Sequence, residues 1–170
     1  TPIQFYKDWI EVAEDEVRHF EMLYSILEEL GFEYGDIEVH NSLYEASLKT
    51  PTLLTRMAIV PRWLEANGLD ANDKIVEKLK NYPNDKIAIK LIEALNVILK
   101  EEIPHVKKGD FWFKWECEKE GLDPVKTYFD IVNRVYKNVS KKSHINIEAR
   151  KRAGFSCVEI KKLSKDEVEC

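Results

Sequence analysis

The stretch FYKDWIEVAEDEVRHFEMLYSILEEL, residues 5–30, decides the fold. Its apolar and aromatic residues recur at spacings of three and four, the period that gathers them on one face of an amphipathic helix. Glu16 and His19 occupy positions on that same face. The whole face reads Phe5, Trp9, Val12, Glu16, His19, Leu23, Ile26 and Leu30. A long helix is therefore predicted to point a carboxylate and an imidazole toward the protein interior.

A second stretch, LIEALNVILKEEIPHVKKGDFW at residues 91–112, repeats this arrangement with Glu102 and His105. Burying an ionised carboxylate costs several kcal/mol unless it is paired or bound to a metal. Both inward Glu-x-x-His steps thus require a compensating partner. The second face reads Leu91, Leu95, Ile98, Glu102, His105, Gly109 and Trp112.

A third inward carboxylate is expected at Glu65, which ends a face formed by Leu54, Ala58 and Pro61. A Glu and a His three residues apart on a helix have Cβ atoms about 5–6 Å apart, close enough to share one metal ion. Some di-metal bundles use Glu-x-x-His from each of two helices and one Glu from each of two others. Five of those six ligands are identifiable here: Glu16, His19, Glu65, Glu102 and His105.

Alternatives stay open at each of these positions. The Glu–His steps could be buried hydrogen-bonded pairs without metal, and Glu65 could be a surface residue at a helix end. Asp15 and Glu101 also precede the two histidines by four residues. Both lie off the apolar faces, so we expect them to face solvent.

The composition fits one helical domain. The 170 residues are 44% hydrophobic and 34% charged, with 6 Gly and 6 Pro. No apolar run reaches the length of a membrane span and no signal peptide opens the chain, so no membrane association is expected. Three widely spaced cysteines, Cys117, Cys157 and Cys170, are interpreted as reduced thiols of a cytoplasmic protein.

Charge is unevenly distributed along the chain. Residues 134–165 contain ten basic and two acidic residues, whereas the whole chain has a net charge of −5. Such a segment could contact phosphates. Because no aromatic residues alternate with the basic ones, a solvated surface is the preferred interpretation. We therefore divide the chain into a helical bundle over residues 1–140 and a basic, partly ordered C-terminal segment over residues 141–170.

The pattern predicts helices throughout and no strands. Two prolines, Pro61 and Pro104, fall within helical faces, where each either kinks a helix or begins a new one; a kink is favoured at Pro104. An Asn67–Gly68 pair is expected to end one helix before another starts at Asp70 or Asn72. The expected helices cover residues 2–30, 39–48, 51–67, 70–79, 85–120, 124–136 and 147–153.

Four segments resemble a bacterial ferritin-like family known mainly as a domain of unknown function. They are DWIEVAEDEVRHFEMLYSILEELGFEYGD (8–36), RMAIVPRWLEANGLD (56–70), EEIPHVKKGDFWF (101–113) and NIEARKRAGFS (146–156). That family is distantly similar to di-iron hydroxylases that modify tRNA. The resemblance implies an all-α, ferritin-like bundle with additional short helices, and metal ligands at Glu16, His19, Glu65, Glu102 and His105.

Members of that family carry an earlier helix that supplies a sixth ligand, another Glu. We expect the present chain to lack this first helix and to leave the site one ligand short. The uncovered face would then be covered by the helix at residues 124–136, by the C-terminal segment, or by a second copy in a homodimer.

Carboxylate and imidazole ligands without thiolates suit iron or manganese. Two iron ions would make the protein an oxygen-dependent oxidase or hydroxylase, with a small molecule or a modified RNA as its substrate. The competing hypothesis is a non-catalytic bundle that binds or handles iron, or whose incomplete site is only structural.

Overall fold

The computed structural model describes residues 1–137 and 139–169, and it is all-α. Within these residues the only β-type pairing is an isolated bridge between Lys142 and Ser164. None of the helices in the described parts combines the length and apolar character that crossing a membrane requires. In chain order the elements are α1 (Ile3–Glu29), α2 (Ser42–Lys49), α3 (Leu53–Ile59), η1 (Val60–Glu65), α4 (Ala66–Leu79), α5 (Lys86–Glu120), α6 (Pro124–Tyr136), α7 (Ile147–Arg152) and α8 (Cys157–Leu163).

The chain divides into two compact units that interleave along the sequence. The first unit contains residues 1–41 and 72–101, and the second contains residues 42–71 and the described residues from 102 onward. Both α4 and α5 contribute to each unit. The division expected from the sequence, with a boundary after residue 140, stays a prediction.

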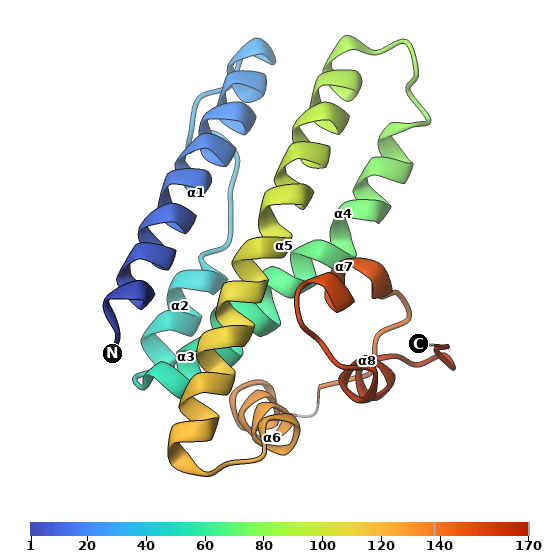
Figure 1. Ribbon diagram of the computed structural model, residues 1–170. Helices are drawn as coiled ribbons and strands as arrows, with labels where there is room; N and C mark the ends of the chain where they lie inside the picture. The colour runs from blue at the N-terminus through green and yellow to red at the C-terminus, as the bar shows by residue number, and fades with distance from the viewer. Residues whose placement is uncertain (138, 170) are drawn as a thin grey trace. The chain divides into compact units, whose positions relative to one another are not determined.

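In the first unit, α1 lies alongside the amino-terminal half of α5 (Figure 1). Val12, His19 and Ile26 are buried, and their spacing of seven residues follows the predicted face of α1. Other positions on that face, such as Leu23 and Leu30, are exposed. The Glu16 side chain is 48% exposed, so the prediction that it points toward the interior was wrong. The predicted face is therefore buried along its centre line and open at its margins.

Most helix ends lie where the capping residues predicted them. Pro2 is the N-cap of α1, and Gly31, with φ +82°, follows its last turn. Asp85 accepts hydrogen bonds from backbone N–H groups in the first turn of α5. Asp123 caps α6, which has Pro124 at its first position.

The predicted break at Asn67–Gly68 was wrong. The chain continues through these residues in α4, which ends at Leu79. The polar side chains interpreted as turn signals make tertiary contacts instead. Asn67 Oδ1 accepts a hydrogen bond from Lys142 Nζ in the second unit, and Asn72 Nδ2 donates to Leu95 O in the first, at 3.0 Å.

The two prolines behave differently. Pro104 lies inside α5, which excludes the alternative of a new helix beginning there. Pro61 lies in the first turn of η1, a π-helix of six residues. Proline has no N–H to donate and clashes with the carbonyl four residues earlier, so a widened turn accommodates it.

Arg62 is the centre of the second unit. Its side chain has no exposed surface, yet it carries a positive charge. Its Nη2 lies 2.7 Å from Glu159 Oε1 and 2.9 Å from Asp110 Oδ1. Three aromatic rings pack within 4.8 Å of its guanidinium carbon: Phe113, Tyr128 and Phe155. The two carboxylates and the ring faces together compensate the buried charge.

A second buried ion network joins α4 to the basic C-terminal segment. Arg150 donates from Nε to Asp70 Oδ1 at 2.9 Å and from Nη2 to Asp70 Oδ2 at 2.8 Å. Lys142 Nζ donates to the same carboxylate at 2.7 Å. Arg150 is fully buried, so the interpretation of residues 134–165 as a solvated surface was wrong at this position.

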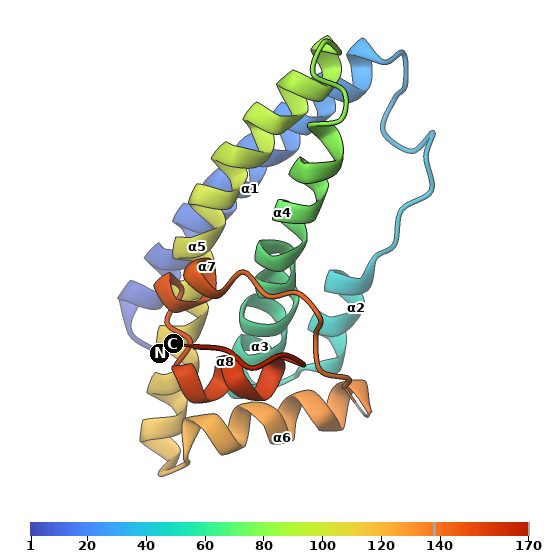
Figure 2. The ribbon, with the colours of Figure 1, turned by 90° about the vertical axis from the view of Figure 1, so that its right-hand side faces the viewer.

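The helix α8, Cys157–Leu163, was not predicted from the sequence. Ser156 begins it with a capping box, in which the hydroxyl accepts from Glu159 N and the Glu159 carboxylate accepts from Ser156 N. This helix lies alongside α6 (Figure 2), and Lys162 Nζ lies 5.2 Å from the Phe129 ring centre.

The prediction that the cysteines are reduced thiols holds for Cys117 but not for Cys157. Cys117 is free and buried, and burial raises the pKa of its thiol to about 11. Cys157 is disulfide-bonded, so the prediction of a reduced thiol was wrong there. Cys170 lies outside the described residues. The cytoplasmic location inferred from reduced thiols stays a prediction.

Two helical glycines give a matched test of packing. A Cβ on Gly109 of α5 would overlap the ring carbons of Pro61, whereas a Cβ on Gly68 of α4 would meet nothing within 4 Å. We expect Gly109→Ala to lower the free energy of unfolding by about 1–3 kcal/mol. Gly68→Ala should raise it by about 0.5–1 kcal/mol, because alanine restricts the unfolded chain. Urea unfolding of both variants measures the two changes, and equal values for the two would contradict the close contact.

Asp70 provides a pH-dependent test. Burial disfavours its charged form, but the hydrogen bond and charge of Arg150 and the charge of Lys142 outweigh burial and lower its pKa. A lowered folded-state pKa adds stability at neutral pH that is lost as pH falls through that pKa. Asp70→Asn should cost about 3 kcal/mol at pH 7, because it leaves Arg150 buried without its carboxylate.

The cost of Asp70→Asn should shrink below about pH 4, where the unfolded carboxyl starts to bind protons. Urea unfolding of both proteins between pH 7 and pH 3 measures the difference. A difference that is constant over this range would show that Asp70 does not stabilise the fold through its charge.

Candidate metal centre

His19 has a carboxylate near each of its ring nitrogens. Nε2 donates to Glu101 Oε2 at 2.8 Å, and Nδ1 lies 3.6 Å from Glu16 Oε2. The His19 side chain is 5% exposed and that of Glu101 is 31% exposed. Arg18 Nη2 also donates to Glu101, at 3.1 Å from Oε1. The ring is therefore held through Nε2, and its Nδ1 is directed toward Glu16.

Glu101 was expected to face solvent, and that prediction was wrong. A carboxylate that holds the outer nitrogen of a histidine fixes the tautomer and the orientation of the ring, as is common for histidines that ligate metals. The sequence contained a signal for this role, because Glu101 directly precedes Glu102. Its position off the apolar face led to the opposite interpretation.

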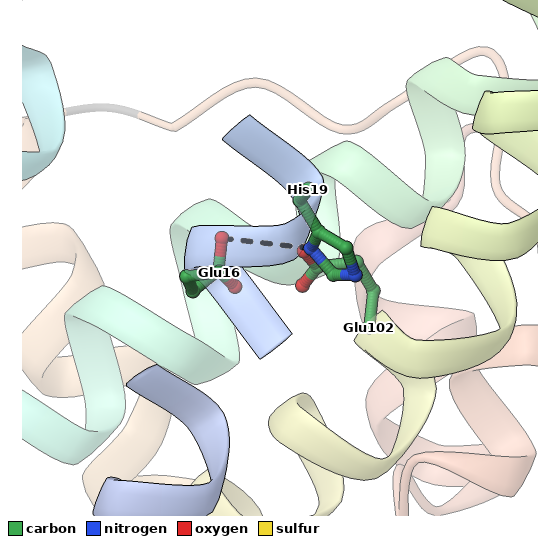
Figure 3. Close-up of side chains that lie close together, drawn as sticks. All are labelled: Glu16, His19 and Glu102. Carbon is green, nitrogen blue, oxygen red and sulfur yellow. Dashed lines mark ion pairs between the residues drawn. The ribbon is translucent and has the colours of Figure 1, made fainter. Parts of the chain in front are cut away.

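Three ligand-type residues lie together. One ligand atom from each of Glu16, His19 and Glu102 lies within 4.8 Å of the other two, and Figure 3 shows their side chains directed toward one another. Glu102 directly follows Glu101 in α5, and Glu101 belongs to the same unit as Glu16 and His19. Helical spacing explains the Glu16–His19 pair, since residues three apart share a face.

The second Glu-x-x-His step repeats the local geometry of the first. His105 is fully buried, and its Nδ1 lies 3.6 Å from Glu102 Oε2, the same distance as in the Glu16–His19 pair. The Glu102 side chain is 19% exposed. Both predicted steps therefore place the carboxylate beside Nδ1 of a buried imidazole.

Glu65 ends η1, is half-buried and has a buried Oε2. In the second unit, η1 runs antiparallel to α5 (Figure 1), and Pro61 lies directly against Gly109. Glu65 is four residues after Pro61, and His105 is four residues before Gly109. Because the helices are antiparallel, both residues lie one turn from this contact in the same direction.

The structure thus brings Glu16, His19 and Glu102 into one cluster and places Glu65 and His105 at one level of the second unit. The convergence of all five residues around one centre stays a prediction. The donor set of the cluster is two carboxylates and one imidazole, which are ligands that iron and manganese accept.

The fold and the cluster define an all-α helical protein with an acidic–histidine group that could hold a metal ion. The chain belongs to the family described as "Protein of unknown function (DUF455)", whose model matches residues 1–161. This finding confirms membership of a family without an established function.

A relative from Haemophilus influenzae (strain Rd), described as an uncharacterized protein, is 39% identical over 155 residues. The match covers 91% of the present chain and 52% of the relative, so the chain spans about half the length of this relative. No solved structure matches the chain.

The role of Glu101 can be tested by metal affinity. Glu101→Ala should lower the affinity for Co²⁺ by about 10–100-fold, because His19 loses the carboxylate that orients its ring. Glu93→Ala is the matched control, since Glu93 is an exposed residue of the same helix and its replacement changes the charge equally. Isothermal titration calorimetry measures both affinities. Equal losses in the two variants would indicate a general effect of charge rather than ring orientation.

Proposed function

We propose that this chain is a ferritin-like di-metal carboxylate protein that binds two iron ions, or two manganese ions, and acts as an oxygen-dependent oxidase or hydroxylase. The proposed ligands are Glu16, His19, Glu65, Glu102 and His105. The observation that carries the proposal is the cluster of Glu16, His19 and Glu102, in which Glu101 holds the outer nitrogen of His19.

The residues fit such a centre in charge as well as in ligand type. Three glutamates supply three negative charges, against four positive charges on two divalent ions. A fourth carboxylate would bring the centre to neutrality, which favours a buried site. The ferritin-like pattern includes this fourth Glu. A second copy in a homodimer, or another polypeptide, is proposed to supply it.

Each residue has a distinct task in this proposal. Glu16 and Glu102 hold the ions beside His19, and Glu101 keeps Nδ1 of that ring directed at them. The half-buried Glu65 contributes a further carboxylate from η1. Two bound ferrous ions would supply electrons to dioxygen, which is the oxidant for the substrate.

A groove near His19 favours the catalytic hypothesis over a purely structural site. It lies on α1 and α5 and has a volume of about 360 Å³. Met22 and Val97 line it, one turn from His19 and from Glu101 respectively. This groove is open to solvent, and none of the five proposed ligands lines it. Its lining residues are Met22, Ser25, Ile26, Glu29, Lys90, Glu93, Ala94 and Val97.

The lining gives only the general character of a substrate. Met22, Ile26 and Val97 offer apolar contact, and Lys90 and Glu29 form an ion pair at its margin. A small molecule with an apolar body fits this lining. A modified RNA is the second substrate class, and the resemblance to tRNA-modifying hydroxylases supports it.

The test is anaerobic loading with Fe²⁺ followed by exposure to oxygen. We expect about two iron ions per chain, a rise in melting temperature on loading because metal binds only the folded state, and an optical change with oxygen uptake. Glu16→Gln should weaken all three responses. Glu21→Gln, on an exposed position of the same helix, is the matched control and should leave them unchanged.

The outcomes separate the hypotheses. Iron binding with a higher melting temperature but without oxygen uptake would favour the non-catalytic, iron-handling bundle. A melting temperature that is the same with metal and with chelator would contradict a metal site coupled to folding. Mass measurement in solution, with and without iron, tests the homodimer.

A further inference from the structure

The backbone around Glu65 is held by side chains from distant parts of the second unit. In an α-helix the Ala66 N–H would donate to Arg62 O, but at the end of η1 it is directed at Pro61 O, Trp63 O and Leu64 O. The Tyr128 hydroxyl of α6 donates to Arg62 O at 3.1 Å. Tyr128 thus donates to a carbonyl that does not receive the Ala66 N–H, its partner in an α-helix.

A second side chain holds the other side of Glu65. Arg150 of α7 donates from Nη2 to Ala66 O at 3.1 Å, while its guanidinium remains paired with Asp70. The carbonyls of Arg62 and Ala66, on either side of Glu65, are therefore both fixed by fully buried side chains from α6 and α7.

Tyr128 and Arg150 can both keep donating these hydrogen bonds at neutral pH. Burial raises the pKa of Tyr128 to about 12, so its hydroxyl keeps its proton at neutral pH. Asp70 compensates the charge of Arg150, and Arg62 is paired with Asp110 and Glu159. The charges of these buried side chains are therefore compensated.

The wide turn determines the direction of the Glu65 side chain. Pro61 is fixed against Gly109 of α5. If η1 closed into an ordinary α-helix, Glu65 would rotate about the helix axis relative to Pro61. The direction of its carboxylate therefore depends on keeping the turn wide.

We propose that Tyr128 and Arg150 are positioning residues that keep η1 in its wide form and thereby direct the Glu65 carboxylate at the metal centre. This inference rests on the proposed function, because it assigns Glu65 as a ligand. The basic C-terminal segment would then also help to position a metal ligand, because Arg150 of α7 is one of the two hydrogen-bond donors.

The experiment uses the full chain and Co²⁺ as the probe, since its visible absorption reports the ligand geometry. Tyr128→Phe removes only the hydroxyl. We expect it to weaken Co²⁺ binding by about tenfold and to change the visible spectrum. Tyr136→Phe is the matched control: Tyr136 is on the same helix and packs against Trp63 of η1, with ring centres 6.0 Å apart. It should leave both readouts unchanged.

A double-mutant cycle with Glu65→Gln separates positioning from a general loss of structure. If Tyr128 acts through Glu65, Tyr128→Phe should have no further effect on Co²⁺ binding in the Glu65→Gln background. Melting temperatures of all variants, measured without metal, report any loss of folding separately.

Each outcome has one meaning. If the wild-type chain binds no Co²⁺, the proposed function fails and this inference fails with it. If the wild type binds Co²⁺ and Glu65→Gln weakens binding, but Tyr128→Phe leaves affinity and spectrum unchanged, the inference alone is overturned. An equal effect of Tyr128→Phe with and without Glu65 overturns it as well.

Discussion

The second unit depends on the compensation of one buried charge, the guanidinium of Arg62. A buried cation is tolerated only where anions and ring faces replace the water it has lost. Asp110 from α5 and Glu159 from α8 supply the anions, and three aromatic rings supply the faces. These groups come from α5, α6, α8 and the segment between α7 and α8. One charge thus requires most of the unit to be in place at once.

The first unit is organised around a histidine instead. His19 is buried on α1, and its contact with Glu101 joins the middle of that helix to α5. A histidine with a purely structural role needs only one hydrogen-bond partner. His19 has Glu101 at Nε2 and a second carboxylate, Glu16, beside Nδ1. A carboxylate at one ring nitrogen, with the other nitrogen directed at further ligand-type groups, is the arrangement common for histidines that bind metals. Glu101 and Glu102 are adjacent in α5. Glu101 contacts Nε2 of His19, whereas Glu102 lies beside Nδ1 of His105.

The parts of the fold that follow local rules could be predicted from the sequence. Proline, aspartate and glycine signals gave the ends of α1, α5 and α6 because capping depends on a few neighbouring residues. The all-α class followed from the helical period of the apolar residues. Helical spacing also predicted the Glu16–His19 and Glu102–His105 pairs.

The failures have a common physical cause, which is long-range pairing of polar side chains. Asn67 was interpreted as a turn residue, but a lysine from the C-terminal segment binds its side chain. Arg150 was assigned to a solvated surface, but it is buried against Asp70. Glu101 was assigned to solvent, but it holds His19. A single sequence shows which residues can pair but not which distant partner each one finds.

The pairing of distant residues also sets an order in time. Arg62 precedes Glu159 by 97 residues, and Asp70 precedes Arg150 by 80. A ribosome makes the chain from its amino terminus, so Arg62 and Asp70 are synthesised long before their partners. Until α7 and α8 have been made, burial of either early charge is unfavourable. Compensation of Arg62 by Glu159 and of Asp70 by Arg150 therefore requires the last part of the unit. Synthesis of α7 and α8 thus supplies the partners that compensate these two charges.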